Sequence, residues 1–186
     1  MKQLVLLFIG AFLLGSCAKN DLKSEFNCGP STTNLELKEY RDVLKKFRAS
    51  VPAHWKTQLY YDDYQSQLYS ADTTKSLKET YIIDIAWHQG ELAIDQFFDQ
   101  TVRDTLAIKQ QLSYIKSSLS QFKDRPAYWN LSKGKTGQLE YHFLQLYVKS
   151  APDEYFTFTT KVYGDAKIDE RLCESLALYE KITFIE

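Results

Sequence analysis

The chain has 186 residues, of which 44% are hydrophobic and 15% aromatic, and its formal net charge is −1 at pH 7. This length fits one compact domain with a sizeable core. The near-neutral charge argues against a nucleic-acid partner, because such proteins usually carry a basic patch. The 13 Tyr and 11 Phe residues favour a fold rich in β-sheet, since aromatic side chains suit half-buried pleated surfaces.

The first seventeen residues have the pattern of a bacterial lipoprotein signal. Lys2 gives a positive start, residues 4–14 are almost entirely apolar, and Leu14-Gly15-Ser16-Cys17 resembles a lipobox. The cysteine of such a signal is diacylated and becomes the first residue of the mature chain. The apolar run is shorter than the about 20 residues that a spanning helix needs. We therefore expect a signal peptide over residues 1–16, later removed, and lipid attachment at Cys17.

This signal predicts a protein that is anchored by lipid in the bacterial cell envelope, with the membrane as one partner. Asp21 is the fourth residue after Cys17 and not at the position associated with inner-membrane retention, which favours the outer membrane. Residues 17–34 are polar and turn-rich, so we expect a flexible tether there. The folded domain is then expected over residues 35–186.

The other two cysteines, Cys28 and Cys173, have two possible states. In an oxidising compartment they could form a disulfide, which would hold the N-terminal tether against the C-terminal helix. The alternative is a pair of free thiols, one buried and one exposed. A zinc site is disfavoured because the sequence has no short Cys/His spacing.

The first predicted element of the domain is a helix over residues 35–46. It is predicted because Leu37, Tyr40, Val43 and Leu44 recur at helical spacing. Strands are then predicted over residues 47–51, 55–61, 64–71 and 79–88. The last of these alternates clearly, with Tyr81, Ile83, Ile85 and Trp87 on one face and Ile82, Asp84, Ala86 and His88 on the other.

Residues 91–109 change to helical periodicity. The predicted apolar stripe, which should pack against the sheet, consists of Ile94, Phe97, Phe98, Val102 and Leu106. Strands are then predicted over residues 114–122 and 126–131, followed by a hairpin turn over 132–137 and long antiparallel strands over 139–149 and 155–163. Gly164-Asp165 precedes a final helix, whose predicted inner stripe is Ile168, Leu172, Ser175, Leu176 and Tyr179.

Three short motifs on this order of elements resemble the PsbP-like family. They are the F-x-x-x-x-P-x-x-W element from Phe47 to Trp55, the R-P-A-Y-W segment from Arg125 to Trp129, and Cys173-Glu174-Ser175-Leu176 in the final helix. The resemblance covers residues 40–184 and implies an α+β fold, an α/β/α sandwich built on a central antiparallel sheet flanked by helices. The family includes a photosystem extrinsic subunit, a nuclear-transport factor and bacterial lipoproteins.

The resemblance implies binding or assembly support without enzymatic chemistry, and the matched positions carry the fold and no functional residues. The sequence agrees, since it has no G-x-S-x-G elbow and no glycine-rich phosphate loop. We therefore expect no catalytic residues, no cofactor and no bound metal. The favoured hypothesis is a binding or assembly module for an envelope protein or a small ligand of unknown identity.

The expected binding surface is a concave sheet face, or the groove between helix and sheet. Its candidate residues are Tyr60, Tyr61, Tyr64 and Tyr69, with Asp62 and Asp63 beside them, because tyrosine suits wet recognition surfaces. Two alternatives remain at this point. One is a metal-dependent or hydrolytic envelope enzyme, with His88 and His142 meeting across the sheet beside Asp84 and Glu140. The other is a purely structural envelope lipoprotein.

Overall fold

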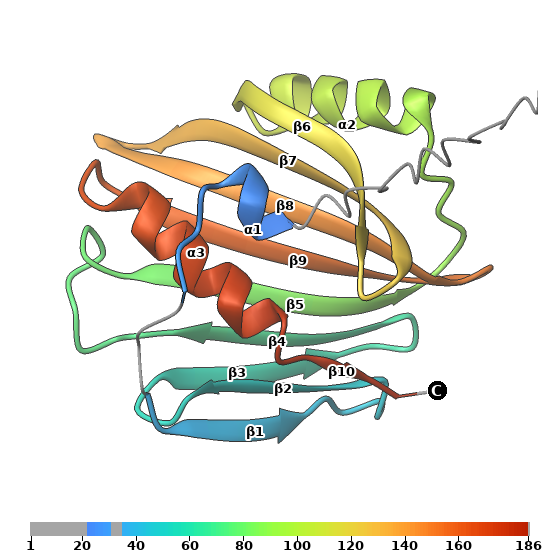
Figure 1. The fold of residues 1–186 in the computed structure, drawn as a ribbon, viewed down its shortest axis with the longest axis horizontal. Coiled ribbons are helices and arrows are strands. Elements are labelled where there is room, and N and C mark those ends of the chain that lie inside the picture. Colours follow the sequence, from blue (N-terminus) through green and yellow to red (C-terminus); the bar gives the residue numbers. More distant parts are fainter. Residues whose placement is uncertain (1–21, 31–34, 186) are drawn as a thin grey trace, which may run out of the picture.

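The computed structural model describes residues 22–30 and 35–185, so the expected signal peptide and Cys17 lie outside the described residues. The helices are α1 (Leu22–Glu25), α2 (Gln96–Lys109) and α3 (Ile168–Tyr179). The strands are β1 (Leu37–Arg41), β2 (Phe47–Pro52), β3 (Lys56–Tyr61), β4 (Gln65–Ala71), β5 (Tyr81–Gln89), β6 (Ser113–Phe122), β7 (Arg125–Thr136), β8 (Leu139–Ala151), β9 (Glu154–Tyr163) and β10 (Thr183–Phe184). Seven strands form one antiparallel sheet in the order β3-β4-β5-β9-β8-β7-β6, and β1-β2-β10 form a smaller sheet (Figure 1).

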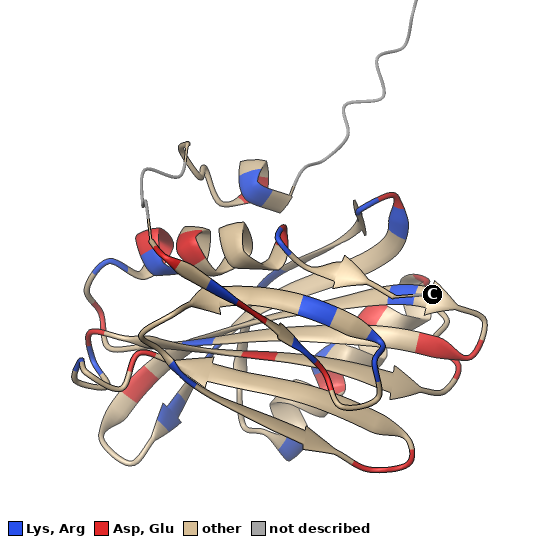
Figure 2. Ribbon diagram, turned by 90° about the horizontal axis from the view of Figure 1, so that it is seen from below, with Lys and Arg blue, Asp and Glu red and all other residues tan. Residues whose placement is uncertain are grey.

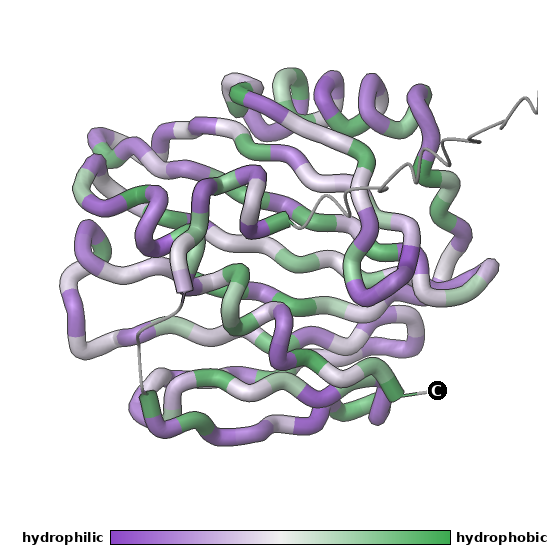
Figure 3. Tube along the Cα trace, in the orientation of Figure 1, coloured by the Kyte–Doolittle hydropathy of each residue, from purple (hydrophilic) through white to green (hydrophobic). Residues whose placement is uncertain are grey.

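The large sheet has two chemically different faces, because successive side chains along a strand point to opposite sides. Ile83 and Ile85 of β5 and Phe158 of β9 lie on the face that we call the inner face, and all three are buried in the main core. Asp84 and Thr159 are paired on the opposite face, the outer face. The same alternation of hydrophobic and hydrophilic residues is visible along the strands in Figure 3.

The inner face is covered by α3, α1 and the small sheet (Figures 1 and 2). The predicted stripe of α3 is confirmed, since Leu172, Leu176 and Tyr179 are buried in this core and Ile168 packs against it. From the small sheet, Phe47 of β2 reaches Phe156 of β9, with ring centroids 6.0 Å apart in an edge-to-face contact. This core supplies the main apolar burial of the domain.

The outer face is covered by α2 over β6, β7 and β8. Val102 and Leu106 of α2 form a second core cluster with Tyr128 of β7 and Phe143 of β8. Helices therefore lie on both faces of a central antiparallel sheet, which confirms the expected α/β/α sandwich. The helix begins at Gln96 and not at Glu91, because Asp95 caps it by accepting a hydrogen bond from the Phe98 N–H at 2.8 Å. Phe97, expected in the apolar stripe, is 72% exposed instead.

The predicted helix over residues 35–46 is wrong. Residues Leu37–Arg41 are strand β1, which pairs antiparallel with β2. The chain reverses between them, where Lys45 has a positive φ and the Asp42 carboxylate accepts a hydrogen bond from the Phe47 N–H at 2.6 Å. Leu37, Tyr40 and Leu44 satisfy the helical spacing, but tertiary pairing with β2 decides the conformation.

The predicted hairpin turn over residues 132–137 is also wrong, because β7 continues to Thr136. Gly134 belongs to the strand, where Leu112 and Tyr141 lie so close that a Cβ would stand 2.3 Å and 2.7 Å from their side-chain atoms. Glycine is therefore required here by close packing within a strand. The reversal comes at Gly137, whose φ is +59°.

The expected flexible tether over residues 17–34 is wrong for the part that the structure describes. Leu22 and Phe26 are buried in the main core, and the Phe26 ring lies 5.1 Å from the ring of Trp129. Cys28 and Cys173 are joined by a disulfide. Residues 22–28 therefore belong to the folded domain. Among residues 22–30 and 35–185, no helix combines the length and apolarity that crossing a bilayer requires.

Candidate binding face

The outer face of β3, β4, β5 and β9 lies beside α2 and carries mainly polar and aromatic side chains. We call this surface the open face because its side chains, apart from the buried Ala86, are partly or largely exposed. The strand register places its principal members on one side of the sheet: Gln58, Tyr60, Gln67, Tyr69, Asp84, His88, Tyr155, Thr157, Thr159, Lys161 and Tyr163.

A single row of polar side chains crosses the outer face from edge to edge. Directly opposed residues of antiparallel strands point to the same side, so each cross-strand pair extends the row by one strand. The row spans all seven strands of the large sheet. This polar row consists of Gln58, Tyr69, Asp84, Thr159, Gln145, Asn130 and Ser117.

Asp84 is the acidic member of the polar row. Its Oδ2 accepts a hydrogen bond from Gln67 Nε2 at 2.7 Å. Its Oδ1 is buried and has no hydrogen-bond partner among the described residues. Burial raises the pKa of the Asp84 carboxyl, and the bond from Gln67 and the charge of Lys161 only partly oppose this. Asp84 is therefore an under-satisfied acceptor at the centre of the open face.

Gln145 and Asn130 carry the next unpartnered groups along the row. Gln145 Oε1 and Asn130 Nδ2 are buried, and neither has a hydrogen-bond partner within residues 22–30 and 35–185. Asn130 as a whole residue is 0% exposed. Its Oδ1 is satisfied, at the limit of hydrogen-bond length, by the Ser132 hydroxyl at 3.5 Å. A buried donor or acceptor without a partner costs about 1–3 kcal/mol, so these groups require an explanation.

Asp99 of α2 ties the helix to the end of the polar row. Its Oδ1 accepts hydrogen bonds from the Ser117 and Tyr128 hydroxyls, each at 2.7 Å, and its Oδ2 lies 2.8 Å from Arg103 Nη2. Burial alone would raise the pKa of the Asp99 carboxyl, but the hydrogen bonds from Ser117, Tyr128 and Arg103 outweigh it and lower the pKa. This network fixes α2 beside the open face.

His88 lies at the end of the open face. Its ring stacks on Tyr155 with centroids 4.8 Å apart, and its Nε2 lies 2.8 Å from the Thr157 hydroxyl oxygen. Burial lowers the pKa of His88, although the negative charge of Asp62 acts in the opposite direction. The imidazole is thus held in a fixed orientation by one ring contact and one hydrogen bond.

The structure separates the four predicted tyrosines. Tyr69 and Tyr60 lie on the open face, opposite Asp84 and Gln67 respectively. Tyr61 is paired with Ser66 and so belongs to the inner-face side of β3, where it is 65% exposed. Tyr64 lies in the β3–β4 turn. The four side chains therefore do not form one surface, and only two of them belong to the open face.

Sequence reasoning missed the contribution of β9. In the segment YFTFTTKVY, alternation alone places Tyr155, Thr157, Thr159, Lys161 and Tyr163 on one side of the strand. This signal is local and could have been recognised. Gln145 and Asn130 could not be found in the same way, because their position beside Thr159 depends on the register of three strands.

The predicted meeting of His88 and His142 is wrong. His142 is paired with the core residue Val162 and points to the inner-face side. His88 is paired with Tyr155 on the outer face. The sheet therefore separates the two imidazoles. Within the described part of the chain, no group of three or more His, Cys, Asp or Glu side chains is arranged to hold a metal ion.

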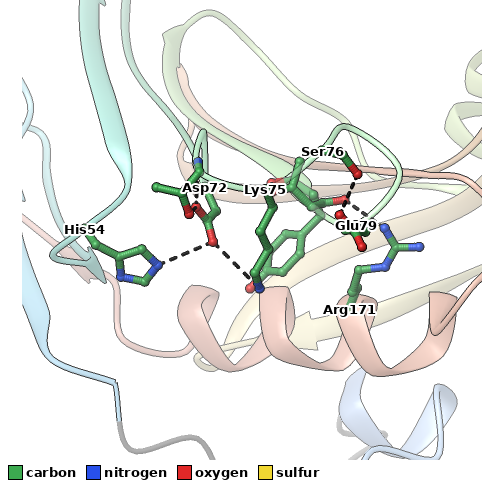
Figure 4. Close-up of polar contacts among 9 residues, drawn as sticks. His54, Asp72, Lys75, Ser76, Glu79 and Arg171 are labelled. Carbon is green, nitrogen blue, oxygen red and sulfur yellow. Dashed lines mark hydrogen bonds and ion pairs between the residues drawn. The ribbon is translucent and has the colours of Figure 1, made fainter.

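A second polar cluster lies at the end of β4 and serves the fold. Asp72 accepts hydrogen bonds from the N–H and hydroxyl of Thr74 at 3.0 and 2.6 Å, with His54 Nε2 at 3.4 Å and Lys75 Nζ at 3.7 Å (Figure 4). Arg171 of α3 donates through Nη1 to three backbone carbonyls, including that of Thr80 at 2.8 Å. These contacts order the β4–β5 loop against α3, so this cluster has a complete structural explanation.

No protein-family model and no curated protein matches the chain. Among solved structures, the chain is similar to the cyanobacterial PsbP (CyanoP) of Synechocystis, with a TM-score of 0.62 and 10% identity over 84% of this chain and 97% of that one. It is also similar to a Pseudomonas aeruginosa protein of unknown function, with a TM-score of 0.46 and 11% identity over 81% and 97%. LpqN of Mycobacterium tuberculosis, a protein involved in cell envelope biogenesis, matches with a TM-score of 0.41 and 10% identity over 83% and 93%.

The chain has a PsbP-like fold, as the sequence motifs predict. The two tryptophans of those motifs, Trp55 and Trp129, are buried in the main core. Trp55 meets the Tyr81 ring edge-to-face at 5.0 Å. At 10% identity the likeness shows the fold alone.

Proposed function

We propose that the protein is a lipid-anchored, non-enzymatic binding module of the bacterial cell envelope, and that it binds its ligand on the open face. One observation supports this proposal: α1, the first described element after the expected anchor, and the open face lie on opposite sides of the large sheet. α1 packs in the inner-face core with α3, whereas Asp84 and its neighbours lie on the outer face.

The anchor would hold the domain close to the bilayer. Five residue steps separate the expected lipidated Cys17 from Leu22, which is already buried in the core. A fully extended chain of that length spans about 18 Å at most. The lipid is therefore attached through a short connection, in place of the long flexible tether expected from composition.

This short connection also favours one orientation. Lys23 of α1 forms an ion pair with Glu180 at the end of α3, and Cys28 is bonded to Cys173 within α3. These contacts hold α1 and Cys28 on the inner-face side, which supports an orientation in which that side faces the lipid surface and the open face points away from it. A ligand in the compartment then reaches the open face without competing with the membrane.

The chemistry of the open face suits binding. Hydroxyl, amide and carboxyl groups from Thr159, Gln67 and Asp84 alternate there with tyrosine rings, which offer both apolar surface and a polar tip. Confinement at a membrane raises the local concentration of such a module, so that a weak interaction becomes useful.

The test of the anchor is replacement of Cys17 in the full-length protein. In cell fractionation we expect Cys17→Ser to move the protein from the membrane to the soluble fraction and to abolish labelling by radioactive palmitate. The control is the double variant Cys28→Ser/Cys173→Ser, which removes the other two cysteines and, although it loses the stabilising disulfide, should still be labelled by palmitate and recovered with the membrane. Density separation should place the anchored protein in the outer membrane. Continued membrane retention of Cys17→Ser would contradict the proposal.

A further inference from the structure

We propose that the centre of the polar row binds a neutral, polyhydroxylated ligand, a short oligosaccharide segment, through Asp84, Gln145 and Asn130. This inference rests on the proposed function, because it names the ligand class of the open face, on which Asp84 lies, and extends the site along the polar row to Gln145 of β8 and Asn130 of β7. Its basis is a set of unsatisfied hydrogen-bonding groups in one line, with the ring of Tyr69 opposite Asp84 at one end.

The unsatisfied groups are complementary to hydroxyls. Asp84 Oδ1 and Gln145 Oε1 are acceptors, Asn130 Nδ2 is a donor, and each is buried without a partner among the described residues. A hydroxyl group can donate one hydrogen bond and accept two. A ligand with several hydroxyls therefore satisfies both kinds of group, whereas a purely anionic or purely cationic ligand satisfies only one.

The spacing favours an extended ligand. Asp84, Thr159, Gln145 and Asn130 occupy four neighbouring strands in direct register. Neighbouring strands lie about 4.8 Å apart, so the three steps from Asp84 to Asn130 span about 14 Å. The Thr159 hydroxyl lies between the two acceptors, which makes the row continuous. Several consecutive hydroxyl-bearing units, and not a single small molecule, match this length.

Tyrosine side chains share the open face with the row, one of them directly beside Asp84. Tyr69 is a member of the row, and Tyr155 and Tyr163 lie at the two ends of β9, on the same side as Thr159. All three side chains are partly exposed. The C–H faces of a sugar ring are apolar, whereas its edge carries hydroxyls. A tyrosine ring can therefore pack against the face of the sugar while the amides of the polar row bind its hydroxyls.

The charge of the site favours a neutral ligand. The centre of the open face carries one acidic and one basic side chain, Asp84 and Lys161, on adjacent strands. Across the whole domain, Lys and Arg are interspersed with Asp and Glu (Figure 2). Phosphate or another strong anion would meet the Asp84 carboxyl beside the single ammonium group, which disfavours it.

Binding requires one local movement. The unpartnered atoms are turned away from solvent, but the Gln145 side chain as a whole is partly exposed. Rotation of this unbranched side chain exposes its amide, whereas Asn130, 0% exposed on the face that α2 covers, is reached only through the space that Gln145 leaves at the edge of α2. Hydrogen bonds with the ligand then satisfy Gln145 Oε1 and Asn130 Nδ2, which have no partner in the free protein among the described residues.

The experiment uses the Cys17→Ser chain, which lacks the lipid and keeps every described residue. Side-chain amide signals of Asn130 and Gln145 are followed by NMR while maltotriose, mannotriose and N,N′,N″-triacetylchitotriose are added to millimolar concentration, with inorganic phosphate as the charged comparison. We expect at least one trisaccharide to shift both amide signals and phosphate to shift neither. The inference is overturned if no trisaccharide shifts them, or if phosphate shifts them equally.

A variant pair separates binding from folding. Gln145→Met removes the unpartnered acceptor at similar volume and should weaken trisaccharide binding at least tenfold without lowering the melting temperature. Gln138→Met, in the exposed β7–β8 turn, is the matched control and should bind normally. Equal binding by both variants contradicts the inference. Membrane anchoring is tested separately, by fractionation of cells that express Cys17→Ser. The result of that test does not alter the trisaccharide titrations, so the inference and the proposed anchoring can fail independently.

Discussion

Cys28 is bonded to Cys173 across 145 positions of sequence, so the segment that follows α1 is covalently attached to α3. The same segment carries Phe26, whose ring lies against Trp129 of β7. The disulfide and the aromatic contact thus add to the Lys23–Glu180 ion pair in holding the N-terminal part of the domain on the side of the sheet opposite the open face.

The first prediction concerns this disulfide. In the chain-entropy model a bond that closes so long a loop stabilises the fold by about 4–5 kcal/mol, reduced by any strain in the native state. Cys28→Ser/Cys173→Ser should therefore lower the free energy of unfolding by several kcal/mol in denaturant titrations. Hydrogen exchange should rise at Leu22–Glu25 before it rises in β5. A variant with unchanged stability would show that the bond has no such role.

The second prediction concerns the pH dependence of stability through Asp84. Burial raises the pKa of Asp84 in the folded protein above its ordinary value of 3.8. Between the two pKa values the folded state binds more protons than the unfolded state, so stability falls as pH rises through this window. Asp84→Asn keeps the acceptor for Gln67 and removes the ionisation. It should melt higher than the wild type at pH 7, and this difference should diminish below pH 3.8.

The third prediction concerns Asp99, which shows the opposite linkage. The pKa of Asp99 is lowered in the folded protein. The ionised carboxylate therefore stabilises the fold at pH values above its ordinary pKa, and this stabilisation is lost as the pH falls through the pKa of the folded state. Asp99→Ala should cost about 1–2 kcal/mol at neutral pH, because it leaves Ser117 and Tyr128 without their acceptor. Asp104→Ala, which removes only an exposed contact with Gln100, is the control and should be nearly neutral. Thermal melts at pH 7 and pH 3 distinguish the two variants.

The fourth prediction separates the tyrosines that the sequence grouped together. Tyr69→Ala should weaken trisaccharide binding about threefold to tenfold, corresponding to an aromatic contribution of about 0.5–1.5 kcal/mol. Tyr64→Ala alters an exposed ring in the β3–β4 turn and should leave affinity unchanged. Isothermal titration calorimetry on the two variants checks this, with melting curves to confirm folding. Equal losses in both variants would contradict a binding site confined to the open face.

Much of the fold could be predicted because its signals are local. The alternation in β5 and β9 and the apolar stripe of α3 each identify an element and its buried side. Over residues 35–46 the helix prediction fails because Leu37, Tyr40 and Leu44 fit helical spacing, whereas the chain reversal at Asp42 and the pairing with β2 depend on tertiary structure.

The candidate site was less predictable because it depends on long-range register. Asp84 and Asn130 lie 46 positions apart in sequence, yet they share one row through β9 and β8. No local pattern contains that pairing. The folded N-terminal segment was missed for a related reason, since its turn-rich composition is typical of a tether and the partner of Phe26 lies on a distant strand.

The orientation of the anchored domain tests the central claim most directly. With Cys28 and Cys173 bonded and Cys17 acylated, a single nitroxide can be attached at Gln58→Cys on the open face or at Lys181→Cys beyond α3. The lipidated protein in liposomes is then measured by electron paramagnetic resonance power saturation with a lipid-soluble and a water-soluble relaxant. We predict strong protection from the water-soluble relaxant near Lys181 and full accessibility at Gln58. Equal accessibility at both positions, or protection at Gln58, would contradict it.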